Sequence, residues 1–227
     1  MNIYKLHTNP EQLYGYEKRL INPQIAWDAF AQDRYAGGDD SSKYLPGILK
    51  GAKESFKFAE EVMKGPFKEG ESIIASSPQY AHDYATYILH GRFLEGEPTI
   101  MKDAHYAAWY ASDILRQRWP EAEPYIMKRP DSAVRYANDV IKGRWPEAEQ
   151  YIKQNAKQSY QYARNMSMYT SHRVRFPEGE PAIMKDPNTA YDYAYVILDR
   201  RWPEAEPYIK QDKNAWAAYK NAFENKR

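Results

Sequence analysis

The chain has 227 residues, and its 32 lysines and arginines balance 31 aspartates and glutamates to a formal net charge of +1. A balanced charge creates no overall field for nucleic acid or an anionic membrane, so any such partner must bind a local patch. The absence of cysteine excludes disulfides and thiol chemistry. No apolar run is long enough for a signal peptide or a membrane span, which predicts a soluble, cytoplasmic protein without a membrane partner.

Residues 1–51 carry only faint versions of a pattern that becomes regular further along the chain. Asn22-Pro23 opens an apolar stretch that includes Trp27 and Phe30. We expect degenerate N-terminal capping helices here, because the terminal repeat of a solenoid needs a polar outer face. The turn-forming residues 37–42 predict a loop, and Asp39 and Asp40 alone supply too few ligands for a cation.

From residue 52 the sequence repeats with a period of 26 residues. The stretch 118–129, RWPEAEPYIMKR, has near copies on both sides, and the sixth copy is displaced by five extra residues. Self-similarity at such a period is the signature of a solenoid, in which each unit buries its apolar face against its neighbours. We predict an all-α repeat solenoid of about six 26-residue units over 52–211, with a C-terminal capping helix over 212–227. The copies begin at Ala52, Pro78, Ala104, Pro130, Ala156 and Pro187.

Each copy predicts a long helix followed by a short one. In the fourth copy, Pro130 suits the first turn and Gly143 suits the stop, as Gly65 and Gly91 do in theirs. A second proline, such as Pro124, then begins a helix of one or two turns whose isoleucine points inward. Small residues at the fourth and eighth positions let neighbouring long helices approach closely. The apolar face of the fourth copy comprises Ala133, Tyr136, Ala137, Val140 and Ile141.

The wording RWPEAEPYIMKRP at 118–130 resembles a repeat that recurs in uncharacterised proteins encoded by tailed bacteriophages. The resemblance covers residues 52–211. It implies a phage origin and an accessory role against host machinery, such as a defence system, and it carries over no catalytic residue.

An arginine precedes the aromatic residue in five copies, and two glutamates follow it at fixed distances. One interpretation is a row of arginines and aromatics for phosphate contact and base stacking. The other is a structural ladder, in which each arginine caps helix carbonyls and pairs with a glutamate. Because ten carboxylates accompany five arginines in register, the structural interpretation is favoured. The series are Arg92, Arg118, Arg144, Arg175 and Arg201; Glu95, Glu121, Glu147, Glu178 and Glu204; and Glu97, Glu123, Glu149, Glu180 and Glu206.

The sequence contains no recognisable catalytic motif. Glutamates two residues apart could divide acid and base roles, but five copies at a spacing set by a turn argue against one asymmetric pocket. The five histidines lack metal-ligand spacing, and no glycine-rich phosphate loop follows a strand. We therefore predict a protein that is not an enzyme and has no metal or cofactor.

The positions that differ between copies are the candidates for partner binding. Trp109 is the largest side chain among them, and it is either an exposed anchor or a contact of the insertion. The five extra residues of the fifth copy fall between Ala163 and Arg175, which we call the inserted segment. Such insertions often emerge on the binding face of a solenoid, although a tolerated surface bulge is the alternative. The candidate binding residues are Trp109, Arg164, Met168, Tyr169, His172, Arg173 and Tyr195.

These features predict a helical repeat protein that binds a macromolecule, with a host protein as the expected partner, and acts by occlusion or scaffolding. One alternative is a protein that sequesters a small nucleotide between repeats or subunits. Another is a nucleic-acid binder, which steep salt dependence would distinguish. Its basic cluster would comprise Arg164, His172, Arg173, Arg175, Arg200 and Arg201.

Overall fold

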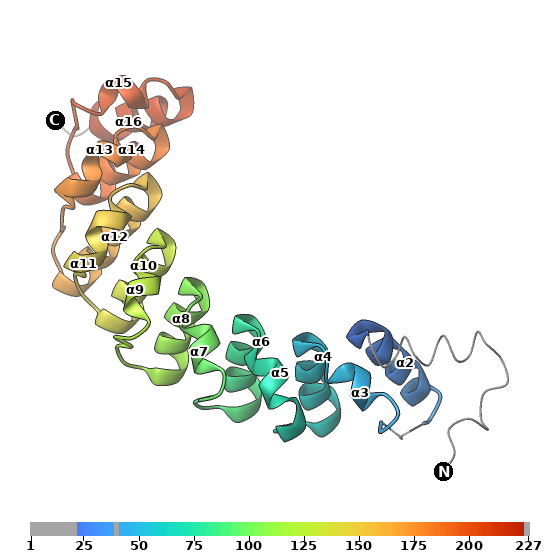
Figure 1. Cartoon of the computed structure of the whole chain (residues 1–227). Helices are drawn as coiled ribbons and strands as arrows, with labels where there is room; N and C mark the ends of the chain where they lie inside the picture. Colours follow the sequence, from blue (N-terminus) through green and yellow to red (C-terminus); the bar gives the residue numbers. More distant parts are fainter. Residues whose placement is uncertain (1–21, 39–40, 225–227) are drawn as a thin grey trace, which may run out of the picture. The chain divides into compact units, whose positions relative to one another are not determined.

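The computed structural model describes residues 22–38 and 41–224, and these ranges are helical without any β-strand (Figure 1). The predicted all-α repeat solenoid is confirmed, because a long helix begins at each of the six predicted starts. The chain divides into two compact units, Met1–Met101 and Lys102–Arg227. The part of the expected N-terminal cap before residue 22, the pair Asp39 and Asp40, and residues 225–227 lie outside the described residues.

In the described part of the first unit, helices α2 and α3 precede the regular repeats. Its elements are α2 (Pro23–Tyr35), α3 (Leu45–Ile48), α4 (Ala52–Lys57), the π-helical η2 (Phe58–Met63), the 3₁₀ turn η3 (Lys68–Gly70), α5 (Glu71–Ala75), α6 (Pro78–Asp83), the π-helical η4 (Tyr84–Leu89) and α7 (Glu97–Ile100).

The second unit continues the same alternation. Its elements are α8 (Ala104–Tyr110), η5 (Ala111–Leu115), α9 (Glu123–Ile126), α10 (Pro130–Tyr136), η6 (Ala137–Ile141), α11 (Pro146–Ile152), α12 (Ala156–Thr170), the 3₁₀ turn η7 (Pro177–Gly179), α13 (Glu180–Ile183), α14 (Pro187–Tyr193), η8 (Ala194–Leu198), α15 (Glu206–Ile209) and α16 (Lys213–Glu224); η5, η6 and η8 are π-helical.

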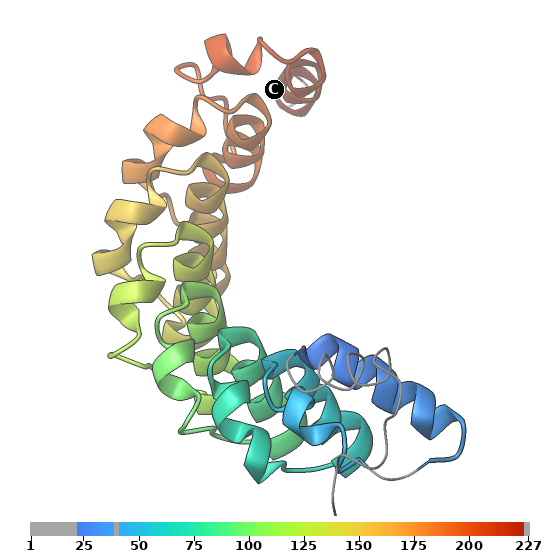
Figure 2. The ribbon, with the colours of Figure 1, turned by 45° about the vertical axis from the view of Figure 1, so that its right-hand side comes forward.

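Long and short helices form two layers in the second unit. The long helices α8, α10, α12, α14 and α16 pack in sequence, each against the next. The short helices α9, α11, α13 and α15 lie on one side of this row, as Figures 1 and 2 show from two directions. This arrangement leaves the opposite side of the long-helix row as a surface that crosses several repeats.

The core follows the predicted positions. The small residues at the fourth and eighth places of the long helices have no exposed surface, and neither do the short-helix isoleucines such as Ile126 and Ile152. The repeat tryptophans Trp119, Trp145 and Trp202 are also buried, as expected. Small side chains therefore set a close approach between long helices, and large rings fill the space beside them.

The second half of the long helix differs from the prediction. In five repeats the helix changes from α to π, and the wider turn takes Val140 and Ile141 out of the 3.6-residue register. Both side chains are half-buried, whereas Ala133, Tyr136 and Ala137 of the same predicted face are fully buried.

The helix stop also differs from the prediction, because the left-handed residue precedes the glycine. Lys142 has φ 55°, and the amide groups of Lys142 and Gly143 both donate to the carbonyl of Ala137. A Cβ added at Gly143 would meet only the carbonyl oxygen of Ile141, at 4.0 Å. Glycine is therefore not required at this place, which explains why Arg200 can occupy it in the sixth repeat. The left-handed residues of the regular repeats are Lys64, His90, Arg116, Lys142 and Asp199.

The C-terminal helix α16 continues the repeat register. It begins at Lys213, 26 residues after Pro187, and buries Tyr219 at the place of Tyr193, but Trp216 and Lys220 stand at the places of the small residues Ala190 and Ala194. The segment predicted as a capping helix therefore keeps the buried tyrosine of the other long helices but lacks their two small residues.

Candidate functional site

The arginine ladder forms part of a buried junction between successive repeats. Arg118 donates from Nε and Nη2 to the two carboxylate oxygens of Glu123, both at 2.8 Å. Tyr136, from the next repeat, donates its hydroxyl to Glu123 at 2.9 Å and accepts the backbone N–H of Trp119 at 2.7 Å. We call this arrangement the tyrosine junction. It recurs around Tyr162, Tyr193 and Tyr219, and around Tyr84 with Lys68 in place of the arginine.

Electrostatics fix the protonation states within the junction. Burial by itself raises the pKa of Glu123, but hydrogen bonds from Arg118 and Tyr136 reverse this and hold it below the ordinary value. Burial, together with the neighbouring carboxylate of Glu123, raises the pKa of Tyr136. The carboxylate therefore stays ionised and the phenol stays protonated at neutral pH, which supports the structural interpretation of the ladder.

The exposed glutamates further neutralise the arginine row. Hydrogen bonds to the paired Glu123 chiefly raise the pKa of Arg118, and the carboxylate of Glu147 adds to the rise. Glu149 and, to a smaller extent, Glu178 act in the same way on Arg144. The arginine side chains keep about half of their surface exposed. Because Arg118 and Arg144 each face a paired carboxylate and a second one nearby, these members of the row do not offer unpaired cations to a phosphate backbone.

Trp109 packs against the following repeat. Its ring centroid lies 4.3 Å from that of His105, and the guanidinium of Arg135 lies 5.0 Å from the Trp109 ring. Arg135 also lies 3.3 Å from Asp139. The structure therefore places this half-buried tryptophan in a cluster that links α8 to α10.

The inserted segment lengthens both a helix and a link. Helix α12 stays α-helical to Thr170, and its left-handed residue is Ser171, three places later than the regular spacing from Lys142 predicts. Arg175 then follows Ser171 by four residues, whereas Arg144 follows Lys142 by two. Three added residues thus extend the helix and two extend the link.

The inserted segment is fastened to the repeats on both sides. Tyr169 donates its hydroxyl to the backbone carbonyl of Asn138 in the preceding repeat. Arg173 forms an ion pair with Asp199 in the following repeat. Within the segment, the backbone N–H of Val174 donates to Ser167 Oγ at 2.8 Å. The insertion therefore spans three repeats as an ordered part of the surface.

The other candidate residues lie around this segment. Arg164 opposes the rise that burial causes in the pKa of Asp192, so the two side chains interact across α12 and α14. Tyr195 stacks on Tyr191 with ring centroids 6.0 Å apart. His172 is exposed on the link of the inserted segment. The structure thus gathers six of the seven candidates around α12, α14 and η8, whereas Trp109 contacts Arg135 of α10, the long helix before α12.

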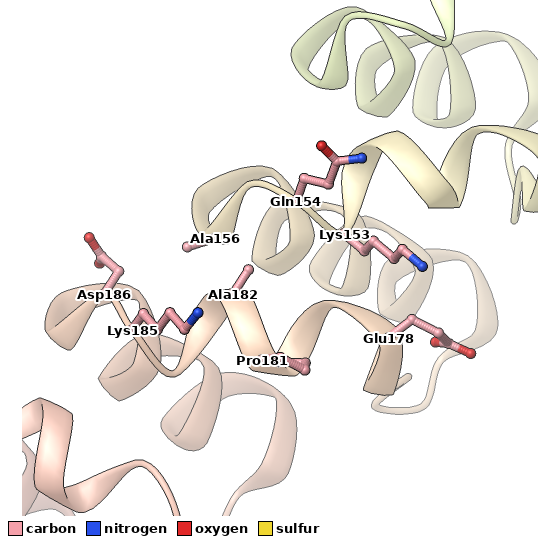
Figure 3. Close-up of a pocket in the computed structure, with 8 residues that line it drawn as sticks. All are labelled: Lys153, Gln154, Ala156, Glu178, Pro181, Ala182, Lys185 and Asp186. Atoms are coloured by element: carbon pink, nitrogen blue, oxygen red, sulfur yellow. The ribbon is translucent and has the colours of Figure 1, made fainter.

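Two grooves open beside the inserted repeat. One, of about 580 Å³, lies between α11 and α13, with Lys153 and Gln154 on one side and Pro181 and Ala182 on the short helix across it (Figure 3). Two lysines and two acids line this groove, so its charge is balanced. The other has about 630 Å³ and lies between the fifth and sixth repeats; it is lined by Arg175, Glu180, Met184, Leu198, Arg200, Arg201, Trp202, Pro203 and Glu204.

Sequence inspection found the arginines of the second groove but missed its apolar residues. Met184 directly follows α13 and Leu198 ends η8, and the sequence does not show that the two line one groove. The signal that was available is Arg200, which stands where other copies have Gly65, Gly91 and Gly143.

The described residues contain no group of three or more histidine, aspartate or glutamate side chains placed to hold a metal ion. Within the same residues, no helix combines the length and apolar character that crossing a membrane requires. Neither a protein-family model, nor a curated protein, nor a solved structure matches this chain.

Proposed function

We propose that this chain is a non-enzymatic helical repeat protein that binds a protein partner through its second unit. The binding surface would comprise the variable positions of α8, α10, α12 and α14 together with the inserted segment. The observation that carries the proposal is that the residues constant between repeats are used inside the array, whereas the variable residues are exposed on its surface. The constant arginine, glutamate and tyrosine form internal junctions, whereas Met168, Tyr169 and Tyr195 are 72%, 45% and 46% exposed.

The chemistry of this surface favours a protein partner over a nucleic acid. Methionine and tyrosine are enriched in protein interfaces, where they supply adaptable apolar contact. The arginine row is neutralised by glutamates, which weakens the case for phosphate binding. Binding would act by occluding or scaffolding the partner.

The resemblance of RWPEAEPYIMKRP to repeats of tailed-bacteriophage proteins supports a partner from the bacterial host. Under this proposal the protein works in the host cytoplasm and inhibits or redirects host machinery, such as a defence system. The inserted segment, which contacts the repeats on both sides, suits this role because it adds a distinct surface to an otherwise regular array.

Affinity capture from bacterial host cells, followed by mass spectrometry, tests the proposal. We expect the native chain to retain a specific protein that a Met168→Glu, Tyr195→Glu variant loses. A matched control, Tyr87→Glu with Leu94→Glu, changes two exposed apolar side chains of the first unit and should retain that protein. Loss of the protein in the control alone would overturn the proposed surface. Capture that nuclease treatment abolishes would overturn the proposed class of partner.

A further inference from the structure

The groove between the fifth and sixth repeats is lined by apolar side chains, which we call its floor, and by guanidinium groups, which we call its rim. Met184, Leu198 and Trp202 supply the apolar part, and Arg175, Arg200 and Arg201 supply the guanidinium groups. Its volume of about 630 Å³ falls in the range of sites that enclose a few side chains or a small ligand. The groove is therefore suited to a short segment and is too small for a folded domain.

The three arginines of the rim differ in whether a carboxylate already pairs with them. Arg175 and Arg201 are held by Glu180 and Glu206 of their own repeats. The side chain of Arg200 is exposed and makes no hydrogen bond or ion pair with any described residue. Glu204 adds one carboxylate to the lining, so Arg200 together with the half-exposed faces of the paired arginines still leaves a place for an incoming anion.

Comparison with the other repeats shows what is special about this groove. Arg200 stands at the place of Gly143, and Met184 stands at the place of Lys153. The sixth repeat thus adds a cation at a place where Gly65, Gly91, Gln117 and Gly143 carry no charge. The methionine is shared with Met101 and Met127, and a lysine replaces it in the fourth repeat. Arg200 and Met184 line the same groove, directly after the inserted segment, which Asp199 anchors through Arg173.

We propose that this groove binds an acidic peptide segment of the protein partner, with an aspartate or glutamate at Arg200 and a neighbouring leucine, methionine or phenylalanine over Met184 and Leu198. This inference rests on the proposed function, because it names the chemistry of the partner beside the inserted segment. A carboxylate fits the planar guanidinium group, and the apolar floor gives the adjoining side chain a place to leave water. A nucleic-acid backbone would use the rim but would leave the floor uncovered.

Selection from a random peptide library displayed against the full chain tests the inference without a known partner. We expect enriched peptides to combine acidic residues with leucine, methionine or phenylalanine. The best peptide, measured by fluorescence anisotropy, should bind Arg200→Gly about tenfold more weakly, since one charge-assisted contact is lost. Arg200→Gly copies the residue at Gly143, so folding should be retained and can be checked by circular dichroism.

Two further variants separate charge from apolar contact. Arg116→Gly removes an exposed arginine from a left-handed position outside the groove, and it should leave peptide affinity unchanged. Met184→Lys copies Lys153 and adds a cation while removing apolar surface. Weaker binding by this variant supports a combined site, whereas tighter binding would show that charge alone matters and would overturn the inference.

The remaining outcomes are also decisive. Enriched peptides without acidic residues, an affinity that Arg200→Gly does not change, or no enrichment at all would overturn the acidic-peptide site. If oligodeoxythymidine displaces the peptide and binds the chain more tightly than the peptide does, the groove is assigned to nucleic acid instead. If host-protein capture still depends on Met168 and Tyr195 in any of these cases, the proposed function stands and only the groove assignment fails.

Discussion

The hydroxyl of Tyr136 lies 2.9 Å from the carboxylate of Glu123, thirteen residues earlier in the chain, and joins the fourth repeat to the third. The same hydroxyl accepts the backbone N–H of Trp119. One oxygen atom thus satisfies a buried donor and a buried acceptor of the preceding repeat.

Replacing Tyr136 with phenylalanine should therefore destabilise the protein. The change leaves the Trp119 N–H without its partner and removes a donor from Glu123, at a cost of about 1 to 3 kcal/mol. Urea unfolding monitored by circular dichroism measures this loss.

A double variant supplies the control for this prediction. The first repeat has Phe58 at the place of the tyrosine, and Leu45 stands 26 residues before Glu71 at the place of the glutamate. Tyr136→Phe combined with Glu123→Leu should cost less than the sum of the two single changes, because their shared hydrogen bond is then counted once; the Trp119 N–H loses its partner in either variant that removes the hydroxyl. Strictly additive losses would show that the two side chains are not energetically coupled.

The close approach of the long helices makes Ala137 intolerant of a larger side chain. Ala137 has no exposed surface, so Ala137→Leu should cost about 1 to 3 kcal/mol or more through overpacking. Asn138→Leu, at the adjacent half-buried variable position, loses the side-chain hydrogen bonds to Asp139 and Tyr169 and should cost no more than about 1 kcal/mol. Thermal unfolding compares the two variants, and equal shifts would contradict the assignment of the buried helix face.

Alkaline pH should destabilise the fold through the junction tyrosines. Burial, reinforced by Glu71, raises the pKa of Tyr84 to about 12 from an ordinary value of 10.0, and the pKa of Tyr136 is raised in the same direction. Above pH 10 the unfolded chain releases these protons while the folded chain retains them, so ionisation favours unfolding. The stabilisation is complete below pH 10 and is lost as the pH rises through the folded pKa.

Melting temperature measured against pH, together with tyrosinate absorbance, tests this expectation. The Tyr136→Phe variant should lose less stability than the native chain over the same pH interval. A melting temperature that stays constant from pH 9 to pH 12 would contradict protonated, buried junction tyrosines.

Deleting residues 169–173 restores the 26-residue spacing and should separate folding from binding. The deletion keeps Ala163 and the Arg175–Glu180 pair, but it removes the contacts of Tyr169 and Arg173 with the neighbouring repeats. We expect a helical, cooperatively unfolding protein of somewhat lower stability that no longer captures the partner. A shortened protein that captures the partner as well as the native chain does would place the binding surface elsewhere.

The regular parts of this fold could be predicted because every repeat must pack closely against its neighbours in the same way. Alanines such as Ala133 and Ala137 recur wherever two helices meet closely, and isoleucines such as Ile126 recur beneath them. The starts of the long helices were equally accessible, because proline and polar residues recur at the first turn.

The π-helical turns could not be predicted in the same way. They depend on which carbonyl accepts the amide of Lys142, and side-chain periodicity does not report that choice. The tyrosine junction escaped prediction for a related reason, because Tyr136 and Glu123 meet only after two helices pack. The groove around Arg200 likewise depends on links that the insertion lengthens.

The tyrosine junction also defines where this array can be cut or extended. Arg144 and Glu149 belong to one repeat, but Tyr162, which completes their hydrogen bonds, belongs to the next. A truncation that stops after the short helix α11 would expose a junction with its carboxylate and the Trp145 amide left open, whereas one that stops after Tyr162 and the rest of α12 would close it. A unit for lengthening the array should therefore run from one junction tyrosine to the next. Such a unit crosses the boundary between two sequence repeats.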